Sequence, residues 1–189
     1  NKQIKEIEDT CEYLNNRSDI IPDICKNTVP VDNLIQLKNI SYKVKDRVIL
    51  NDLSLDIQKG ERLLLLGENG CGKTTLLRII ARLQKPSSGE MSQNIVLNPK
   101  RTKQWFRKVG VVYQNPNYQL FMPTVEAEVG YNAESPEYAE NILKLFDLES
   151  IRNKHPQSLS EGQKRRLTIA AVLAGKPDLL LLDEPTVGQ

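Results

Sequence analysis

The chain has 189 residues, a length that one domain of ordinary size would use completely. Its 26 basic and 24 acidic side chains leave a formal net charge of +2, and 39% of its residues are apolar. This balance excludes a strongly acidic tail protein and a polybasic protein held mainly by phosphate attraction. The longest aliphatic runs, residues 63–66 and 179–182, are far shorter than the roughly 20 apolar residues that cross a bilayer.

Residues 1–33 differ in charge from the rest of the chain. They hold 4 bases and 7 acids, a net of −3, which leaves 22 bases and 17 acids, a net of +5, for residues 34–189. A heptad-spaced apolar set, Ile4, Ile7, Cys11 and Leu14, predicts a short helix that would be marginal alone. We interpret residues 1–33 as a linker or the tail of a preceding segment, with a docking helix as the alternative, and place one domain at 34–189.

Strand and helix patterns alternate from residue 34 onward. Partial period-two alternation over residues 34–44 and 48–57 predicts antiparallel strands at a sheet edge. The short apolar run at 63–66 predicts a central parallel strand buried on both faces. A helix with an apolar stripe that reaches Leu83 is predicted to follow from Lys73. Further buried strands are predicted at 109–113 and 179–182, and helices at 136–148 and 163–174. This order predicts an α/β domain with a mainly parallel sheet.

The strongest motif is GENGCGKT, which fits the phosphate-binding pattern G-x-x-x-x-G-K-[ST] and lies between a predicted strand and a predicted helix. Glycines let successive N–H groups face phosphate oxygens, and the helix N-terminus adds its positive dipole end. Lys73 would neutralise phosphate charge, and the Thr74 hydroxyl would coordinate Mg²⁺. The predicted ATP-binding residues are Gly67, Glu68, Asn69, Gly70, Cys71, Gly72, Lys73, Thr74 and Thr75.

Two acids end the second aliphatic run. LLLLDEP places Asp183 at the carboxyl end of a predicted strand, where open α/β sheets bind ligands. We expect Asp183 to hold Mg²⁺, directly or through water, and Glu184 to act on the attacking water as general base. Read alone, a solvated strand end would be the better interpretation, but the loop at Gly67 supplies the other half of a nucleotide site.

A third motif, LSEGQ, precedes a predicted helix. Ser160 and Gln163 fit a capping box, which is a sufficient structural reason for their presence. The same geometry can cradle an anion. The motif nevertheless lies more than eighty residues from the first phosphate loop.

The ordered set GENGCGKT, VVYQNP, LSEGQKRR and LLLLDEPTVG resembles the nucleotide-binding domain of ATP-binding-cassette proteins over residues 34–189. The resemblance implies a P-loop NTPase fold with a mainly parallel sheet, antiparallel edge strands and an inserted helical subdomain. It implies ATP and Mg²⁺ as cofactors and a head-to-tail dimer of two such domains. Leu159, Ser160, Glu161, Gly162 and Gln163 would then serve, in trans, the γ-phosphate bound by the partner domain. Gln114 would link the magnesium and water site to the helical subdomain.

A finer resemblance concerns the segment QNPNYQLFMPTVEAEV, which is similar to cobalt and energy-coupling-factor importer ATPases. It implies an ATPase that powers an importer and lies at the cytoplasmic side of the membrane, bound to a transmembrane subunit. Tyr118, Leu120 and Phe121 would pack on the core or against that partner. The alternatives are a cassette ATPase acting on ribosomes or DNA and a regulatory module that binds nucleotide without hydrolysing it.

Some positions depart from the family pattern. The place of the usual adenine-stacking aromatic is taken by Val44, with Tyr42 two residues earlier as a substitute. Glu161 replaces the commoner glycine, and we expect it to point outward from a phosphate. The only histidine, His155, precedes the LSEGQ motif of residues 159–163, which we call the signature, and is expected to be solvated or to cap a turn. The family's switch histidine and Asp-containing loop would lie beyond Gln189, so the resemblance implies that the C-terminal part of the domain is missing and that the 189 residues alone hydrolyse ATP negligibly.

A basic stretch between Glu90 and Glu126 contains no acid and surrounds Trp105 and Phe106 with Lys100, Arg101, Lys103, Arg107 and Lys108. Basic residues interleaved with aromatics can bind nucleic acid. The same stretch matches the family's ordinary approach to its glutamine, so a solvated face is the preferred interpretation and no nucleic-acid partner is predicted.

Overall fold

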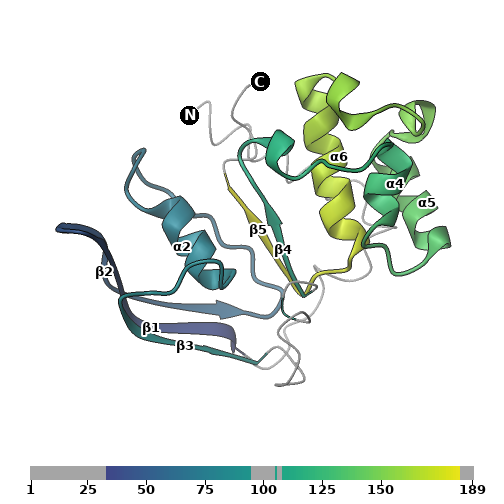
Figure 1. Cartoon of the computed structure of the whole chain (residues 1–189). Coiled ribbons are helices and arrows are strands. Elements are labelled where there is room, and N and C mark those ends of the chain that lie inside the picture. The colour runs from purple at the N-terminus through teal and green to yellow at the C-terminus, as the bar shows by residue number, and fades with distance from the viewer. Residues whose placement is uncertain (1–32, 95–104, 106–107, 184–189) are drawn as a thin grey trace. The chain divides into compact units, whose positions relative to one another are not determined.

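The computed structural model describes residues 33–94, 105 and 108–183, which form two compact units (Figure 1). The core unit consists of the described residues up to Val111 together with residues 177–183, and the helical unit consists of residues 112–176. Within the described residues the chain thus leaves the core unit once and returns to it once. The helical unit is an insertion in the core sequence.

A three-stranded antiparallel sheet opens the core unit. Its strands are β1 (Asn33–Val44), β2 (Arg47–Gln58) and β3 (Ser88–Gln93), in the order β2-β1-β3. Leu37 lies opposite Leu55 of β2 and Met91 of β3. The alternation in β1 and β2 therefore predicts the sheet correctly, since it places apolar side chains of neighbouring strands on one face.

The helix α2 (Lys73–Ile80) buries its apolar stripe against this sheet (Figure 1). Leu76, Leu77, Ile79 and Ile80 of α2 share one core cluster with Ile35, Leu37 and Ile40 of β1. Leu83, which the sequence assigns to the same stripe, lies beyond the end of the helix and is 46% exposed. The helix is shorter than predicted, and Arg82 after it has a positive φ of 59°.

Two further strands, β4 (Val109–Val112) and β5 (Leu179–Leu182), pair with each other. The Asp178 N–H donates to the Lys108 carbonyl at 2.8 Å, so the two strands start side by side and run parallel (Figure 1). Both strands lie where the sequence predicts them, but β4 ends one residue earlier and only Leu181 of β5 is buried rather than half-buried.

The prediction of a buried central strand at residues 63–66 is wrong. No strand is assigned there, and Leu63, Leu64 and Leu66 are 44%, 53% and 76% exposed. A central strand needs hydrogen-bonding neighbours on both edges. Among the described residues β4 and β5 pair only with each other, so this run has no ladder to join.

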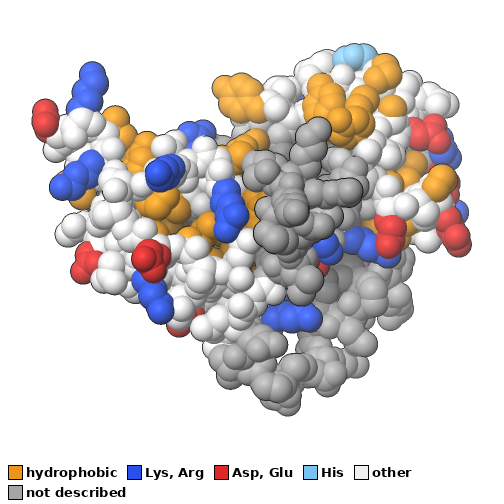
Figure 2. Space-filling view, turned by 60° about the horizontal axis from the view of Figure 1, so that its bottom comes forward, with side chains coloured by type: hydrophobic (Ala, Val, Ile, Leu, Met, Phe, Trp, Pro, Cys, Tyr) orange, Lys and Arg blue, Asp and Glu red, His pale blue; other side chains and the backbone are white. Residues whose placement is uncertain are grey.

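The helical unit packs α4 (Val125–Gly130), α5 (Pro136–Leu145) and α6 (Glu161–Ala174) around a second apolar cluster. The connections contain the 3₁₀ turns η1 (Pro116–Tyr118), η2 (Glu149–Ile151) and η3 (Pro156–Ser158). Apolar side chains are visible at the surface of this unit beside the single histidine (Figure 2). None of the helices in the described part of the chain has the length and apolar character that a membrane crossing requires.

Candidate nucleotide site

The loop before α2 has the backbone that close approach to an anion requires. Gly70 and Gly72 have φ values of +82° and +101°, and Gly72 is the N-cap residue of α2. A Cβ on Gly72 would lie 2.9 Å from Leu50 Cδ2 and 3.1 Å from the Ile49 carbonyl, so β2 leaves no room for a side chain. No side chain caps α2, and the first N–H groups of the helix therefore remain available to a ligand.

Lys73 closes the same loop. Its ammonium donates to the Gly67 carbonyl at 2.8 Å and to the Glu68 carbonyl at 3.0 Å. The positive charge is thereby held over the loop rather than extended into solvent. Glu68, Asn69 and Cys71 are exposed, so the outer side of the loop is open.

The first residues of α2 meet the end of β5. The Thr74 hydroxyl donates to the Asp183 carboxylate at 2.9 Å, across 109 positions of sequence. Asp183 is 8% exposed, and Thr74 and Thr75 are half-buried. Because a buried carboxylate is costly without partners, the Thr74 hydrogen bond stabilises Asp183 at the place where β5 ends.

This pair of oxygen donors fits Mg²⁺. The ion takes hard oxygen ligands and is usually held by one or two protein groups, with waters and substrate phosphates completing the octahedron. The hydroxyl and the carboxylate are such groups, and they adjoin the loop that would hold the phosphates. The described residues contain no cluster of three or more His, Cys, Asp or Glu side chains that could hold a metal.

The two residues predicted to contact adenine differ in their surroundings. Tyr42 is half-buried and packs against the core cluster of β1 and α2, whereas Val44 is 48% exposed near the end of β1. Tyr42 is therefore engaged in core packing. Val44 is the more accessible of the two.

The signature residues begin α6 in the helical unit. Ser160 and Gln163 form the predicted capping box, with Gln163 N donating to Ser160 Oγ at 3.3 Å and Ser160 N to Gln163 Oε1 at 3.0 Å. Leu159 is buried, and a Cβ on Gly162 would meet nothing within 4 Å. The Glu161 side chain is 68% exposed and pairs with Lys164 at 3.3 Å. Its carboxylate thus has a partner within its own helix.

Gln114, Glu184 and His155 are the other residues that the sequence singled out. Gln114 belongs to the helical unit, directly after β4 and Tyr113. Glu184 lies outside the described residues, as do residues 185–189. His155 caps η3 by accepting from Gln157 N at 3.2 Å, which confirms the capping interpretation.

Trp105 is unavailable as a stacking platform for nucleic acid. It is 1% exposed, its indole N–H donates to the Ala81 carbonyl at 3.0 Å, and Arg82 stacks on its ring at 4.5 Å. Lys108 pairs with Asp178 at 3.2 Å. Residues 100–104 and 106–107 of the basic stretch lie outside the described part of the chain.

Sequence reasoning missed two buried charged residues of the helical unit, Glu128 and Lys164, which are 4% and 8% exposed. Each shares a helix face with an apolar residue: Glu128 follows Val125 by three positions, and Lys164 precedes Leu167 by three. A charged side chain on the apolar face of a helix is the signal that would have identified both.

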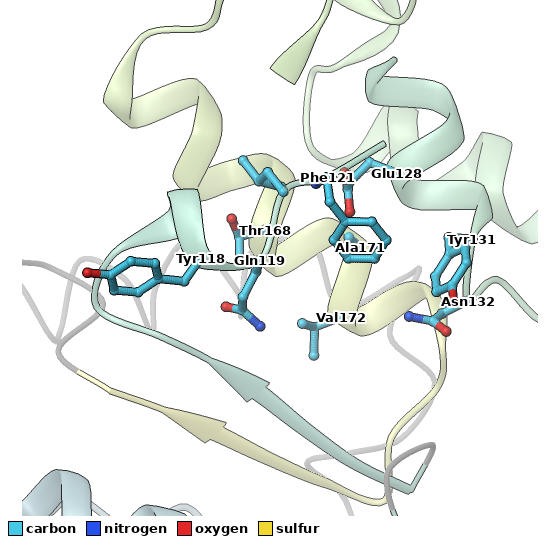
Figure 3. A pocket seen from close by; sticks show the side chains of 10 residues that line it. Tyr118, Gln119, Phe121, Glu128, Tyr131, Asn132, Thr168, Ala171 and Val172 are labelled. Carbon is cyan, nitrogen blue, oxygen red and sulfur yellow. Dashed lines mark hydrogen bonds between the residues drawn. The ribbon is translucent and has the colours of Figure 1, made fainter. Parts of the chain in front are cut away.

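Glu128 also lines a hollow of about 220 Å³ at the surface of the helical unit. Phe121 and Tyr131, which are 67% and 60% exposed, also line this hollow, and their rings contact each other edge to face with centroids 5.5 Å apart (Figure 3). Tyr118, another residue that lines the hollow, is 80% exposed. Leu120, by contrast, is buried in the helical core, which is the first of the two alternatives predicted for this segment, whereas Tyr118 and Phe121 are exposed.

Comparison with known protein families identifies a match over residues 50–187 to the family described as ABC transporter. An ABC transporter ATP-binding protein of Methanosarcina mazei, so described provisionally, is 40% identical over 92% of this chain and 31% of its own length. A protein of Bacillus subtilis provisionally described as the HMP/thiamine import ATP-binding protein YkoD is 36% identical over 84% of this chain and 30% of its own length. The chain thus spans about a third of the length of these two relatives.

Solved structures show the same fold. CbiO1 from Clostridium perfringens, described as part of the ABC transporter complex cbiONQ, superposes with a TM-score of 0.70 at 34% identity, over 83% of this chain and 67% of CbiO1. The ATP-binding cassette MJ0796, solved as a dimer in a post-hydrolysis state with ADP and Pi, gives a TM-score of 0.66 at 30% identity, over 81% of this chain and 75% of its own.

Proposed function

Because the chain belongs to the ABC transporter family of ATP-binding domains, we propose that it binds and hydrolyses ATP to power an importer of the energy-coupling-factor type. The observation that carries the proposal is the hydrogen bond from Thr74 to Asp183, which joins the phosphate loop to the strand-end carboxylate. The resemblance of residues 114–129 to importer ATPases and the likeness to CbiO1 support the transporter type.

The described residues would have two roles, binding of the phosphates and binding of Mg²⁺. The loop from Gly67 to Gly72 would bind the β- and γ-phosphates with its N–H groups, and Lys73 would exchange its loop carbonyls for phosphate oxygens. Thr74 and Asp183 would hold Mg²⁺, with Gln114 near its water. The ion supplies charge neutralisation at the phosphate oxygens.

The reaction is an in-line displacement at the γ-phosphorus. A water oxygen forms the new bond, the bond to the β-phosphate oxygen breaks, and ADP leaves with that oxygen. Glu184 would accept the proton of the attacking water. The signature residues 159–163 of a second domain would add donors for the γ-phosphate, which makes a head-to-tail dimer the active form.

The partner in the membrane would contact the aromatic surface formed by Tyr118, Phe121 and Tyr131. Exposed aromatic side chains around a hollow are typical of protein interaction sites. In this proposal the domain is peripheral, at the cytoplasmic side of the membrane, and a separate subunit provides the spanning helices and selects the substrate.

The test is Asp183→Asn in the complete protein with its partners. We expect turnover to fall at least about a hundredfold and Mg²⁺-dependent thermal stabilisation by ATP to be lost, since a ligand of the ion is removed. Asp178→Asn, at the other end of β5, is the matched control and should retain both properties. Mg²⁺-dependent turnover that survives Asp183→Asn would refute the proposed site.

The role of Glu184 has its own test. Glu184→Gln keeps the size of the side chain and removes the base, so it should preserve ATP binding and trap an ATP-bound dimer detectable by size-exclusion chromatography. Unchanged turnover in this variant would show that another group activates the water.

A further inference from the structure

Residues 113–122, which include Gln114, are held to the rest of the helical unit by several hydrogen bonds. We call these residues the strap, because they join β4 to the segment that leads into α4. Within the strap, Tyr113 N donates to Gln119 Oε1 at 2.8 Å. From outside it, Gln157 donates to the Leu120 carbonyl at 3.4 Å, and Glu128 Oε2 accepts from Phe121 N and Met122 N at 2.9 and 2.8 Å.

One contact ties the strap to the signature helix. Lys164 Nζ donates to Asn117 Oδ1 of η1 at 3.0 Å and to Glu161 Oε1 of the first turn of α6 at 3.3 Å. The Lys164 side chain is only 10% exposed, so this ammonium depends on these two acceptors for much of the solvation it has lost. Asn117 lies three residues after Gln114, and Glu161 belongs to the signature itself.

We propose that Lys164 is a positioning residue for ATP hydrolysis: its ammonium fixes the strap to the N-terminus of α6, so that Gln114 and the signature move as one piece. The proposal rests on the proposed function, in which Gln114 and the signature both act at the phosphates. Lys164 itself need not touch nucleotide. Its effect passes through Asn117 on one side and Glu161 on the other.

The experiment uses two variants that cut the same contact from opposite sides, in the complete protein with its partners. Lys164→Met removes the ammonium and keeps the length of the side chain. Asn117→Ala removes the acceptor at an exposed position, so it leaves the apolar core untouched. Lys144→Met, which removes an exposed lysine from α5 of the same unit, is the matched control.

Each contact variant should lower kcat at least about fivefold while KM for ATP stays within about twofold. Amide hydrogens of the strap, such as Gln119 N, should exchange with solvent at least about threefold faster, and Lys144→Met should change neither quantity. Asn117→Asp offers the ammonium a carboxylate, so it should keep wild-type kcat and slow the exchange.

Unchanged kcat and unchanged exchange in Asn117→Ala would overturn the proposal, even if Lys164→Met fails to fold. A rise in KM that accounts for the whole loss would also overturn it, because the contact would then act on nucleotide binding alone. If the wild-type assembly does not hydrolyse ATP, the proposed function fails. Hydrogen exchange then decides separately whether Lys164 ties the strap to α6.

Discussion

Lys73 illustrates how one side chain can serve both the free and the bound forms of the loop. Its ammonium now bonds to the carbonyls of Gly67 and Glu68, which hold the loop closed. An arriving phosphate would replace neutral carbonyl acceptors by charged oxygens, and hydrogen bonds to charged groups are the stronger. The loop therefore needs little rearrangement on binding, which reduces the cost of ordering it.

Gly162 gives a prediction at the scale of one residue. A Cβ added there would contact nothing within 4 Å, so Gly162→Ala should leave the fold intact and raise the free energy of unfolding by up to about 1 kcal/mol. If this glycine faces the partner domain's γ-phosphate, the added methyl group should nevertheless lower turnover of the assembled dimer at least about tenfold.

Gly130→Ala is the matched control for Gly162→Ala. Gly130 ends α4, and a Cβ there would also meet nothing within 4 Å. Chemical denaturation and steady-state ATPase assays of both variants check the prediction. Wild-type turnover in Gly162→Ala would mean that the signature does not approach nucleotide closely.

The sequence predicts residues with a fixed backbone requirement better than residues whose role depends on packing. Gly72 and Lys73 could be assigned because the turn, the helix start and the ammonium are all encoded within eight positions. Lys164 could not, since its acceptor Asn117 is 47 positions away and the contact exists only once η1 and α6 are packed. Which of Tyr42 and Val44 is accessible likewise depends on which of the two side chains packs in the core.

At the scale of elements, one arginine connects three parts of the helical unit. Arg152, directly after η2, forms ion pairs with Glu126 of α4 and with Glu140 of α5, the latter at 3.0 Å. The hydrogen bond from Arg152 lowers the pKa of Glu126 below its ordinary value, and the two glutamates raise the pKa of Arg152. These short elements are therefore held by charge as well as by their apolar faces.

This ion-pair network predicts an acid-sensitive helical unit. A carboxyl group with a lowered pKa in the folded state stabilises that state above its unfolded pKa, and the contribution disappears as the pH falls through the folded value. Arg152→Met should therefore lower Tm at pH 6, and the gap between variant and wild type should be narrower at pH 3, because the contribution of Glu126 declines as the pH falls toward its lowered pKa.

Thermal melts followed by circular dichroism at the two pH values measure this gap. Lys144→Met is again the control, because it removes an exposed charge that is absent from the network. A gap of the same size at pH 3 would assign the effect of Arg152 to the packing of its aliphatic stem rather than to its charge.

The helices α5 and α6 were predicted from the sequence, whereas α4 and β3 were not. The capping serines Ser135 and Ser160 mark the starts of α5 and α6. By contrast, β3 has the sequence SGEMSQ, which carries no apolar alternation, and its pairing depends on Gly89. A Cβ on Gly89 would lie 2.4 Å from the Asn39 carbonyl of β1.

At the scale of the whole molecule, the run at residues 63–66 is the main departure from expectation. An apolar run in the sequence does not determine whether neighbouring strands are present to cover residues 63–66. Apolar side chains exposed beside backbone without a strand partner favour association between copies of the chain. The combined variant Leu64→Ser, Leu66→Ser should therefore sediment at lower mass than wild type at micromolar concentration.

Analytical ultracentrifugation measures that association, with Leu83→Ser as the control for an exposed leucine outside the run. We expect the control to sediment like wild type. Equal association of all three chains would show that another surface is responsible.

The parallel pairing of β4 with β5 has a consequence for the order of folding. The pair joins strands separated by the 66 residues from 113 to 178, and closing a flexible loop of that length costs about 4 kcal/mol of chain entropy, apart from a constant. A helical unit that folds first replaces this loop by a compact body, so we expect helix formation to precede closure of the core.

The single tryptophan, Trp105, belongs to the core cluster, and its fluorescence should change later than the far-ultraviolet signal of the helices during refolding. Coincident signals would show instead that both units fold in one step.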